Sequence, residues 1–364
     1  MKIGNFQEVT MDFIPLEFKL LTDDVFTLNE YGEPLLETSL VRGLENIPGV
    51  LHLSGGKTYG REHGNNGKLL YRVVPDDMRL PVFLVPYEQK NVGFSKVFDN
   101  MYVTFRFLSW DGKHPLGKLT NSIGNVNALP SFYEYQLYCR SLNTSIQLFN
   151  KETNKKVKTM ASTMSMDDII NKYDNIEDRR GEDWHIFTID PQASTDFDDG
   201  FSIRTLENKG DVMISIYIAN VTILLDVLGL WETFSRRVST IYLPDRKRPM
   251  LPTILSDSLC SLQEKNTRFA MTMDVCVDTN TGEIKNVSFV NCAIRVFKNY
   301  RYNEEALHQD KDYIHLQRIT IMLSYRYKYI KNIHDSHDVV CYLMTLMNYH
   351  CACDLLSFKN GIFR

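Results

Sequence analysis

The sequence lacks the features that mark secreted, membrane and zinc-binding proteins. Its first twenty residues carry acidic side chains among apolar ones and have neither the basic start nor the apolar run of a signal peptide. The longest apolar stretch, residues 214–231, is interrupted by Asn220 and Asp226, which makes it a poor membrane span. The seven cysteines are dispersed and include no C-x-x-C pair, so we expect reduced core side chains rather than zinc ligands. These absences predict an intracellular protein with no membrane partner, cytoplasmic unless it is nuclear.

The sequence also lacks the positive charge of many nucleic-acid-binding proteins, because its formal net charge is −4. Its cations are instead gathered locally, for example at residues 236–248, where a solvated surface is the alternative interpretation. There is no internal repeat. At 364 residues, with 43% hydrophobic content, the chain is long enough for two or three domains with buried cores.

One stretch differs from the rest of the chain, because residues 188–201 read T-I-D-P-Q-A-S-T-D-F-D-D-G-F. Its four carboxylates repel one another, and the apolar residues between them predict packing against a core, so cations are needed to offset the repulsion. Carboxylate oxygens suit Mg²⁺ or Mn²⁺, whereas zinc prefers His and Cys, and the spacing does not fit an EF-hand. A solvated acidic loop is the alternative. The predicted metal ligands are Asp190, Asp196, Asp198 and Asp199.

The first part of the chain predicts a small β-barrel. Residues 1–48 have weak periodicity and stay unassigned. From residue 49 to about 130, short strand-like pieces alternate with Gly and Pro, which is typical of a barrel, and a helix over 132–149 completes the region 49–150. Exposed aromatic and basic side chains on such a barrel often bind RNA, although the same residues would also fill a core.

The second part predicts a mixed α/β domain, so the expected fold class is α+β. We interpret residues 151–180 as a linker and a short helix, and residues 181–364 as the domain that carries the aspartates. Strands on both sides of the acidic stretch would hold its carboxylates rigidly. The pattern also predicts a helix ending near Val238, a later hairpin and two closing amphipathic helices. The expected strands are 186–190, 201–206, 212–221, 269–277 and 286–296, and the closing helices cover 316–330 and 340–351.

Residues 239–262 read S-T-I-Y-L-P-D-R-K-R-P-M-L-P-T-I-L-S-D-S-L-C-S-L. Three prolines and Tyr242 stand among Arg and Lys side chains there. This composition favours a shaped loop that binds a polyanion, and a proline-fixed surface loop is the alternative.

The acidic and proline-rich stretches, in this order and separation, resemble the catalytic domain of the ribonuclease II family of 3′-to-5′ exoribonucleases, which includes ribonuclease R. The motifs are I-D-P, D-x-D-D, I-A-N-V, Y-L-P, P-M-L-P and L-S-D-S-L-C-S-L. A weaker resemblance covers P-D-D-M-R-L-P, P-L-G-K-L and I-G-N-V upstream, which look like the second cold-shock barrel of the family, and S-H-D-V-V and G-I-F-R downstream. Together the resemblance covers roughly residues 49–364.

The resemblance implies a function for particular residues. Asp190 and Asp199 match the principal metal ligands, while Asp198 and Asp196 match residues that hold a second ion and order the attacking water. Tyr242 matches the tyrosine that stacks on the 3′-terminal base. We add Arg246 and Arg248 as phosphate contacts, on position alone. The implied activity is hydrolysis of single-stranded RNA from its 3′ end to nucleoside 5′-monophosphates.

The sequence also departs from the family pattern. Gly200 replaces a usual alanine, and Tyr217 and Asn220 stand where many relatives have histidine and aspartate. The later arginine motif and the C-terminal OB-type domain of the family are absent, so we expect a domain that is incomplete at its C-terminus, with a second chain as a candidate for the missing part. An RNA-binding protein on an inactive nuclease scaffold is the alternative function, and a metal-dependent phosphatase is a third.

Overall fold

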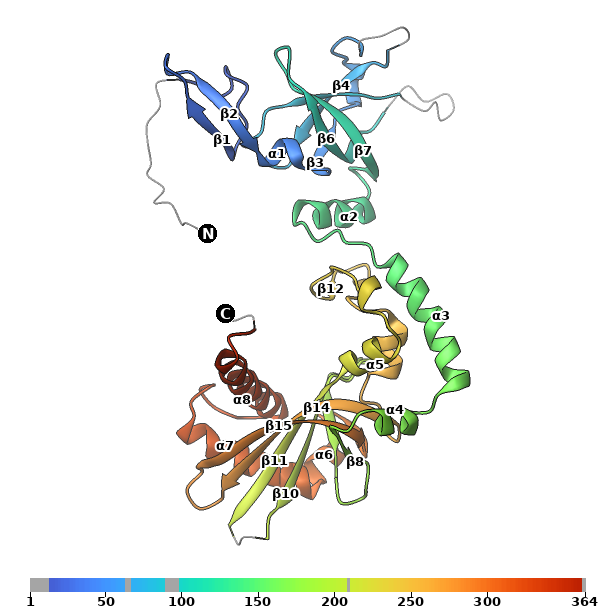
Figure 1. Cartoon of the computed structure of the whole chain (residues 1–364), viewed down its shortest axis with the longest axis vertical. Helices are drawn as coiled ribbons and strands as arrows, with labels where there is room; N and C mark the ends of the chain where they lie inside the picture. Colours follow the sequence, from blue (N-terminus) through green and yellow to red (C-terminus); the bar gives the residue numbers. More distant parts are fainter. Residues whose placement is uncertain (1–12, 63–66, 89–97, 208–209, 362–364) are drawn as a thin grey trace. The chain divides into compact units, whose positions relative to one another are not determined.

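The computed structural model describes residues 13–62, 67–88, 98–207 and 210–361 and contains two compact units (Figure 1). The first unit runs to Thr144 and includes Tyr242–Lys247, and the second comprises Ser145–Ile241 and the chain from Arg248 onwards.

The first unit is built on a closed barrel in which the strand order is β3-β4-β5-β7-β6. Its strands are β3 (Ile47–Leu51), β4 (Leu70–Pro75), β5 (Phe83–Pro86), β6 (Met101–Ser109) and β7 (Leu116–Asn125). Alternating apolar residues of these strands, among them Val73, Phe83 and Phe105, are fully buried. At Gly49 a Cβ atom would lie 2.8 Å from the carbonyl oxygen of Val74, so the barrel needs glycine there. The predicted small barrel is confirmed.

Residues left unassigned by the sequence form a hairpin of β1 (Asp24–Leu28) and β2 (Pro34–Ser39), followed by α1 (Leu40–Gly43). Most side chains of this hairpin are exposed on both faces, so the sequence shows no alternation. The turn between the two strands is stabilised by its own residues, because the Asn29 side chain accepts hydrogen bonds from the backbone N–H groups of Tyr31 and Glu33.

The prediction of one helix over 132–149 followed by a linker is wrong in detail. The chain forms α2 (Leu129–Cys139), which ends before Ser141 with φ 55°, and then α3 (Gln147–Thr163). The basic segment expected to be a linker lies inside α3, because Phe149, Thr153 and Val157 are buried at helical spacing. The short helix expected next is α4 (Met166–Lys172), and a capping box with Asp168 starts it.

The second unit contains a seven-stranded sheet of order β16-β9-β10-β11-β14-β15-β8. Its strands are β8 (Ile176–Arg179), β9 (Phe187–Asp190), β10 (Asp199–Thr205), β11 (Asp211–Ala219), β14 (Thr267–Asp278), β15 (Ile284–Arg295) and β16 (Lys298–Arg301). The five strands predicted from the sequence are present, and β14 and β15 form the expected hairpin. Two parallel pairs, β16 with β9 and β15 with β8, join segments that are far apart in the sequence.

One face of this sheet is covered by α6 (Glu305–Gln309), α7 (Lys311–Arg326) and α8 (Ser336–Ser357), as Figure 1 shows. The helix expected over 316–330 begins and ends earlier, because α7 runs from Lys311 to Arg326. Helix α8 is long and apolar enough to cross a membrane by length and composition alone. However, Val339, Leu343 and Leu346 are fully buried in the core against the sheet, and a core helix passes the same test.

The other face carries α5 (Val221–Val227), the short η2 turn (Trp231–Thr233) and the π-helical η3 (Ile254–Leu259). The helix expected to end near Val238 is shorter, since α5 stops before Gly229, which has φ +56°. The proline-rich stretch is more regular than expected, because β12 (Ile241–Tyr242) and β13 (Lys247–Arg248) form a two-stranded ladder.

Candidate active site

The four aspartates lie where β9 ends and β10 begins. Asp190 is the last residue of β9, Asp199 is the first of β10, and Asp196 and Asp198 lie in the loop between them. The two strands are antiparallel neighbours, with Phe187 paired to Phe201. Because the end of β9 is adjacent to the start of β10 in this antiparallel pair, the four aspartates lie at one end of the two strands.

Backbone hydrogen bonds fix the second half of this loop. The carbonyl oxygen of Phe197 accepts from Leu262 N at 2.8 Å, and its N–H donates to Ser261 Oγ at 3.0 Å. The carbonyl oxygen of Asp198 accepts from Ala219 N at 2.8 Å. The I-A-N-V and L-S-D-S-L-C-S-L motifs of the sequence therefore hold the acidic loop in place.

Burial and mutual repulsion raise the pKa values of two of the carboxyls. Burial raises the pKa of Asp190 to about 6, and the charges of Asp198 and Asp196 act in the same direction, against a hydrogen bond from Thr188 and the charge of Arg301. Burial raises the pKa of Asp199 to about 7, together with the charges of Asp190 and Asp198. The four carboxyls are thus electrostatically coupled.

The same two residues show what the site requires. Within the described part of the chain, the buried Oδ2 atoms of Asp190 and Asp199 have no hydrogen-bond partner. A buried carboxylate oxygen without a partner is costly, and a divalent cation would satisfy both atoms and offset the repulsion. Oxygen ligands suit Mg²⁺ or Mn²⁺, so the residues present fit such an ion.

Residues 179–343, which contain all four aspartates, match the family model described as RNB domain. This match, together with the similarity to ribonuclease R and DIS3-like proteins, supports the ribonuclease II/R family for this domain. It is 26% identical over 274 residues to DIS3-like exonuclease 2 of Schizosaccharomyces pombe, covering 72% of this chain and 28% of that protein. It is 28% identical over 243 residues to ribonuclease R of Thermotoga maritima, covering 66% of this chain and 31% of that protein. The chain therefore spans less than a third of the length of these relatives.

Solved structures show the same fold. Ribonuclease R of Mycoplasma genitalium, in complex with ribose-methylated single-stranded RNA, has a TM-score of 0.62 at 19% identity and covers 92% of this chain and 56% of that protein. Yeast Ssd1, described as a pseudonuclease, has a TM-score of 0.55 at 14% identity, covering 83% of this chain and 37% of Ssd1. The expected α+β architecture is confirmed, and the Ssd1 likeness means that the fold alone does not establish catalysis.

The predicted RNA-binding residues Tyr242 and Arg248 lie on the ladder of β12 and β13, and Arg246 lies in the loop between the two strands. Tyr242 is 73% exposed, which leaves its ring accessible for stacking. The guanidinium of Arg246 donates to Glu134 Oε1 at 3.2 Å, and Arg248 is 7% exposed. Because Tyr242 and the RNB aspartates belong to different units, their joint role stays a prediction.

The three departures from the family pattern have structural roles. Asn220 caps α5 by accepting from Thr222 N and also donates to Asn291 Oδ1 at 2.9 Å. Tyr217 is fully buried with its hydroxyl 2.9 Å from Ser202 Oγ. Gly200 pairs with Tyr217 across β10 and β11, and a Cβ atom there would make a tight contact of 3.3 Å with the carbonyl oxygen of Phe187.

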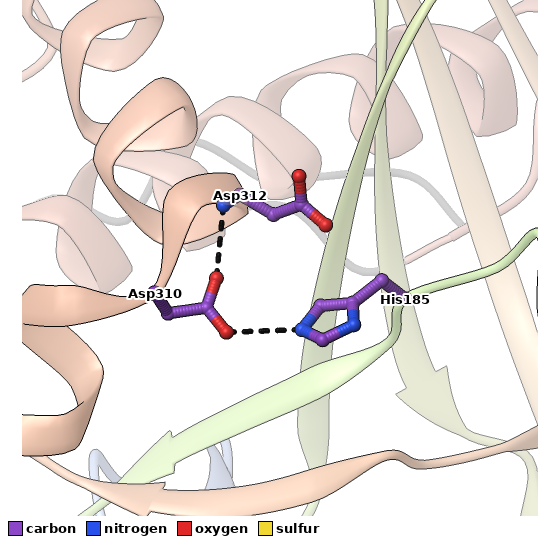
Figure 2. Close-up of side chains that lie close together, drawn as sticks. All are labelled: His185, Asp310 and Asp312. Carbon is purple, nitrogen blue, oxygen red and sulfur yellow. Dashed lines mark hydrogen bonds and ion pairs between the residues drawn. The ribbon is translucent and has the colours of Figure 1, made fainter.

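A second cluster that could hold a metal ion by its residue types is His185, Asp310 and Asp312 (Figure 2). Here, however, both oxygens of Asp310 have partners. Oδ1 accepts the N–H groups of Asp312 and Tyr313 at 2.9 and 3.0 Å and so caps α7. Oδ2 accepts from the Tyr300 hydroxyl at 2.8 Å and lies 3.0 Å from His185 Nε2. Burial acts to raise the pKa of Asp310, but these hydrogen bonds outweigh it and the pKa is lowered. Because both oxygens have partners and one of them caps α7, the cluster has a structural role.

Sequence reasoning missed Arg301, which lies beside the RNB aspartates. Arg301 is the parallel register partner of Asp190 in β16 and β9, and its charge opposes the rise in the pKa of Asp190. No local pattern indicates this, because the two residues are brought together by a parallel pair of strands.

Proposed function

We propose that this chain hydrolyses single-stranded RNA from the 3′ end and releases nucleoside 5′-monophosphates with the help of two divalent ions. Membership of the RNB family and the single-stranded RNA bound by ribonuclease R of Mycoplasma genitalium support the substrate class. The observation that carries the proposal is that the buried Oδ2 atoms of Asp190 and Asp199, which lie in a group of four interacting carboxyls, have no hydrogen-bond partner among the described residues.

In this proposal, Asp190 and Asp199 would be the principal metal ligands. Asp196 and Asp198 would help to hold a second ion and orient the attacking water. When bound, two divalent ions stabilise the attacking and leaving oxygens of an in-line displacement at a phosphodiester. The exposed ring of Tyr242 stacks on the terminal base without sequence preference, because every base has a π-face. Arg246 contributes positive charge for the phosphates. No protein nucleophile is needed.

The direct test is a gel assay with single-stranded RNA labelled at either end, with and without Mg²⁺. Stepwise shortening of the 5′-labelled strand, with mononucleotides from the 3′-labelled one, is expected. Asp198→Asn should abolish the activity without unfolding the protein, whereas Asp354→Asn, an exposed aspartate on α8, should leave it intact. Absence of trimming by the wild-type chain, alone or with a candidate second chain that completes the domain, overturns the proposal.

An RNA-binding function without catalysis is the second candidate. It is favoured by the likeness to the fold of yeast Ssd1, which is described as a pseudonuclease. Calorimetry separates the two functions. RNA binding without Mg²⁺ or Mn²⁺ uptake supports the second, and uptake that Asp199→Asn removes supports the first.

A further inference from the structure

The acidic loop is anchored at its two ends but exposed in between. Asp190 is held in β9, and Phe197 and Asp198 are held by backbone hydrogen bonds from Leu262 and Ala219. Between these points, residues 191–193 are exposed to solvent. A turn in which Ser194 N donates to the carbonyl oxygen of Pro191 at 3.1 Å gives this segment its shape. Asp196 follows this segment in the chain.

Arg301 spans this exposed segment. Its Nη1 donates to the carbonyl oxygen of Pro191 at 2.9 Å, and its Nη2 donates to that of Ser194 at 3.4 Å. The guanidinium carbon also lies 5.2 Å from the centre of the Phe197 ring, which is a cation–π distance. One side chain therefore contacts the beginning, the middle and the end of the loop.

The base of the Arg301 side chain is itself fixed. Its backbone lies in β16 opposite Asp190, and its N–H donates to Glu304 Oε2 at 3.0 Å. Glu304 is held in turn by Lys298 at 2.8 Å. The next residue, Tyr302, donates its N–H to the carbonyl oxygen of Asp190 at 3.2 Å. The backbone at Arg301 is thus held against β9, the strand that ends in Asp190.

We propose that Arg301 is a positioning residue of the metal site, which braces the loop between Asp190 and Asp198 through the carbonyl oxygens of Pro191 and Ser194. The inference rests on the proposed metal site and adds a residue to it. A planar fork with several donors suits two carbonyl groups better than the single ammonium of lysine. Groups that orient metal ligands typically change metal affinity about 10–100-fold when they are removed.

Bracing and simple charge make opposite predictions. A guanidinium close to the carboxylates repels a cation, so a purely electrostatic role predicts tighter Mn²⁺ binding by Arg301→Met and unchanged binding by Arg301→Lys. The bracing role predicts about 10-fold weaker binding by Arg301→Met and a smaller loss by Arg301→Lys, because the lysine ammonium can still donate to one of the two carbonyl oxygens. Arg318→Met, on the exposed side of α7, is the matched control and should bind as the wild type does.

Two measurements test this on the full chain. Calorimetry with Mn²⁺ gives the affinities, and hydrogen exchange of the metal-free chain reports on the amides of residues 192–196. Faster exchange of these amides in Arg301→Met, with unchanged exchange in the sheet, is expected. Unchanged loop exchange, or Mn²⁺ binding as tight as in the wild type, overturns the inference alone. A wild-type chain that takes up no Mn²⁺ overturns the proposed function together with this inference.

Discussion

The two ends of β9 carry clusters of the same residue type with opposite properties. At its start, Asp310 lies against His185 with both oxygens hydrogen-bonded and its pKa lowered. At its end, Asp190 and Asp199 keep buried oxygens without partners among the described residues, and their pKa values are raised. Both sites contain aspartates, so the presence of carboxylates does not distinguish them. A structural carboxylate has hydrogen-bond partners for both oxygens, whereas a candidate metal ligand keeps a buried oxygen without one.

The largest expected effect comes from neutralising a carboxylate at the candidate site. Asp199→Asn should reduce RNA trimming by about 10²–10³-fold, as loss of one electrostatic group in an active site typically does. The same substitution should stabilise the metal-free chain at pH 8 by about 1–3 kcal/mol, because it removes a buried, repelled charge. Trimming rates and urea unfolding measure the two effects. A destabilised Asp199→Asn chain would contradict the comparison.

At the other end of β9, removing a carboxylate should destabilise the chain instead of stabilising it. Asp310→Ala should destabilise the chain by about 2–3 kcal/mol, since it removes the cap of α7 and leaves the Tyr300 hydroxyl without its acceptor. Asp310→Asn should destabilise the chain less than Asp310→Ala does, because its amide oxygen still caps the helix. Mn²⁺ affinity should stay unchanged in both variants, and loss of Mn²⁺ binding would show that this cluster is also a metal site.

The two clusters should make stability depend on pH in opposite directions. A carboxyl whose folded pKa is raised contributes stability below its unfolded pKa and loses it as pH rises through the folded value, about 6 for Asp190 and about 7 for Asp199. The lowered pKa of Asp310 acts in the opposite direction and only in more acidic solution.

The free energy of unfolding of the metal-free wild-type chain should therefore fall by about 1–3 kcal/mol between pH 5 and pH 8. Mg²⁺ should restore stability at pH 8 more than at pH 5. Urea unfolding in EDTA measures this difference, and the double variant Asp190→Asn/Asp199→Asn is the control that should remove it. A loss of equal size in the double variant would assign the pH dependence to other groups.

The smallest expected effect is that of Gly200→Ala. The added methyl group would lie 3.3 Å from the carbonyl oxygen of Phe187, which is tight, while the loss of glycine stiffens the unfolded chain. These effects oppose each other, so thermal unfolding should detect a change within about 1 kcal/mol. A larger loss would show that glycine is required beside Asp199.

The sequence predicted the acidic site well because its signal is local. All four aspartates fall within ten residues, and apolar strands flank them on both sides. Five of the seven strands of the sheet were predicted for the same reason, whereas the short strands β8 and β16 were not. The hairpin of β1 and β2 and the helix α3 were missed, because an exposed hairpin has no alternation and a helix with few buried residues resembles a polar linker.

The sequence by itself determined the resemblance to the ribonuclease II family and the four carboxylates, since both depend on residue types at short spacing. Only the tertiary structure decided which carboxylate oxygens lack a partner and which cation braces the loop. Arg301 and Pro191 are separated by 110 positions and meet through the parallel pairing of β16 with β9. Burial and hydrogen-bond partners arise from contacts between distant segments, so no local pattern encodes them.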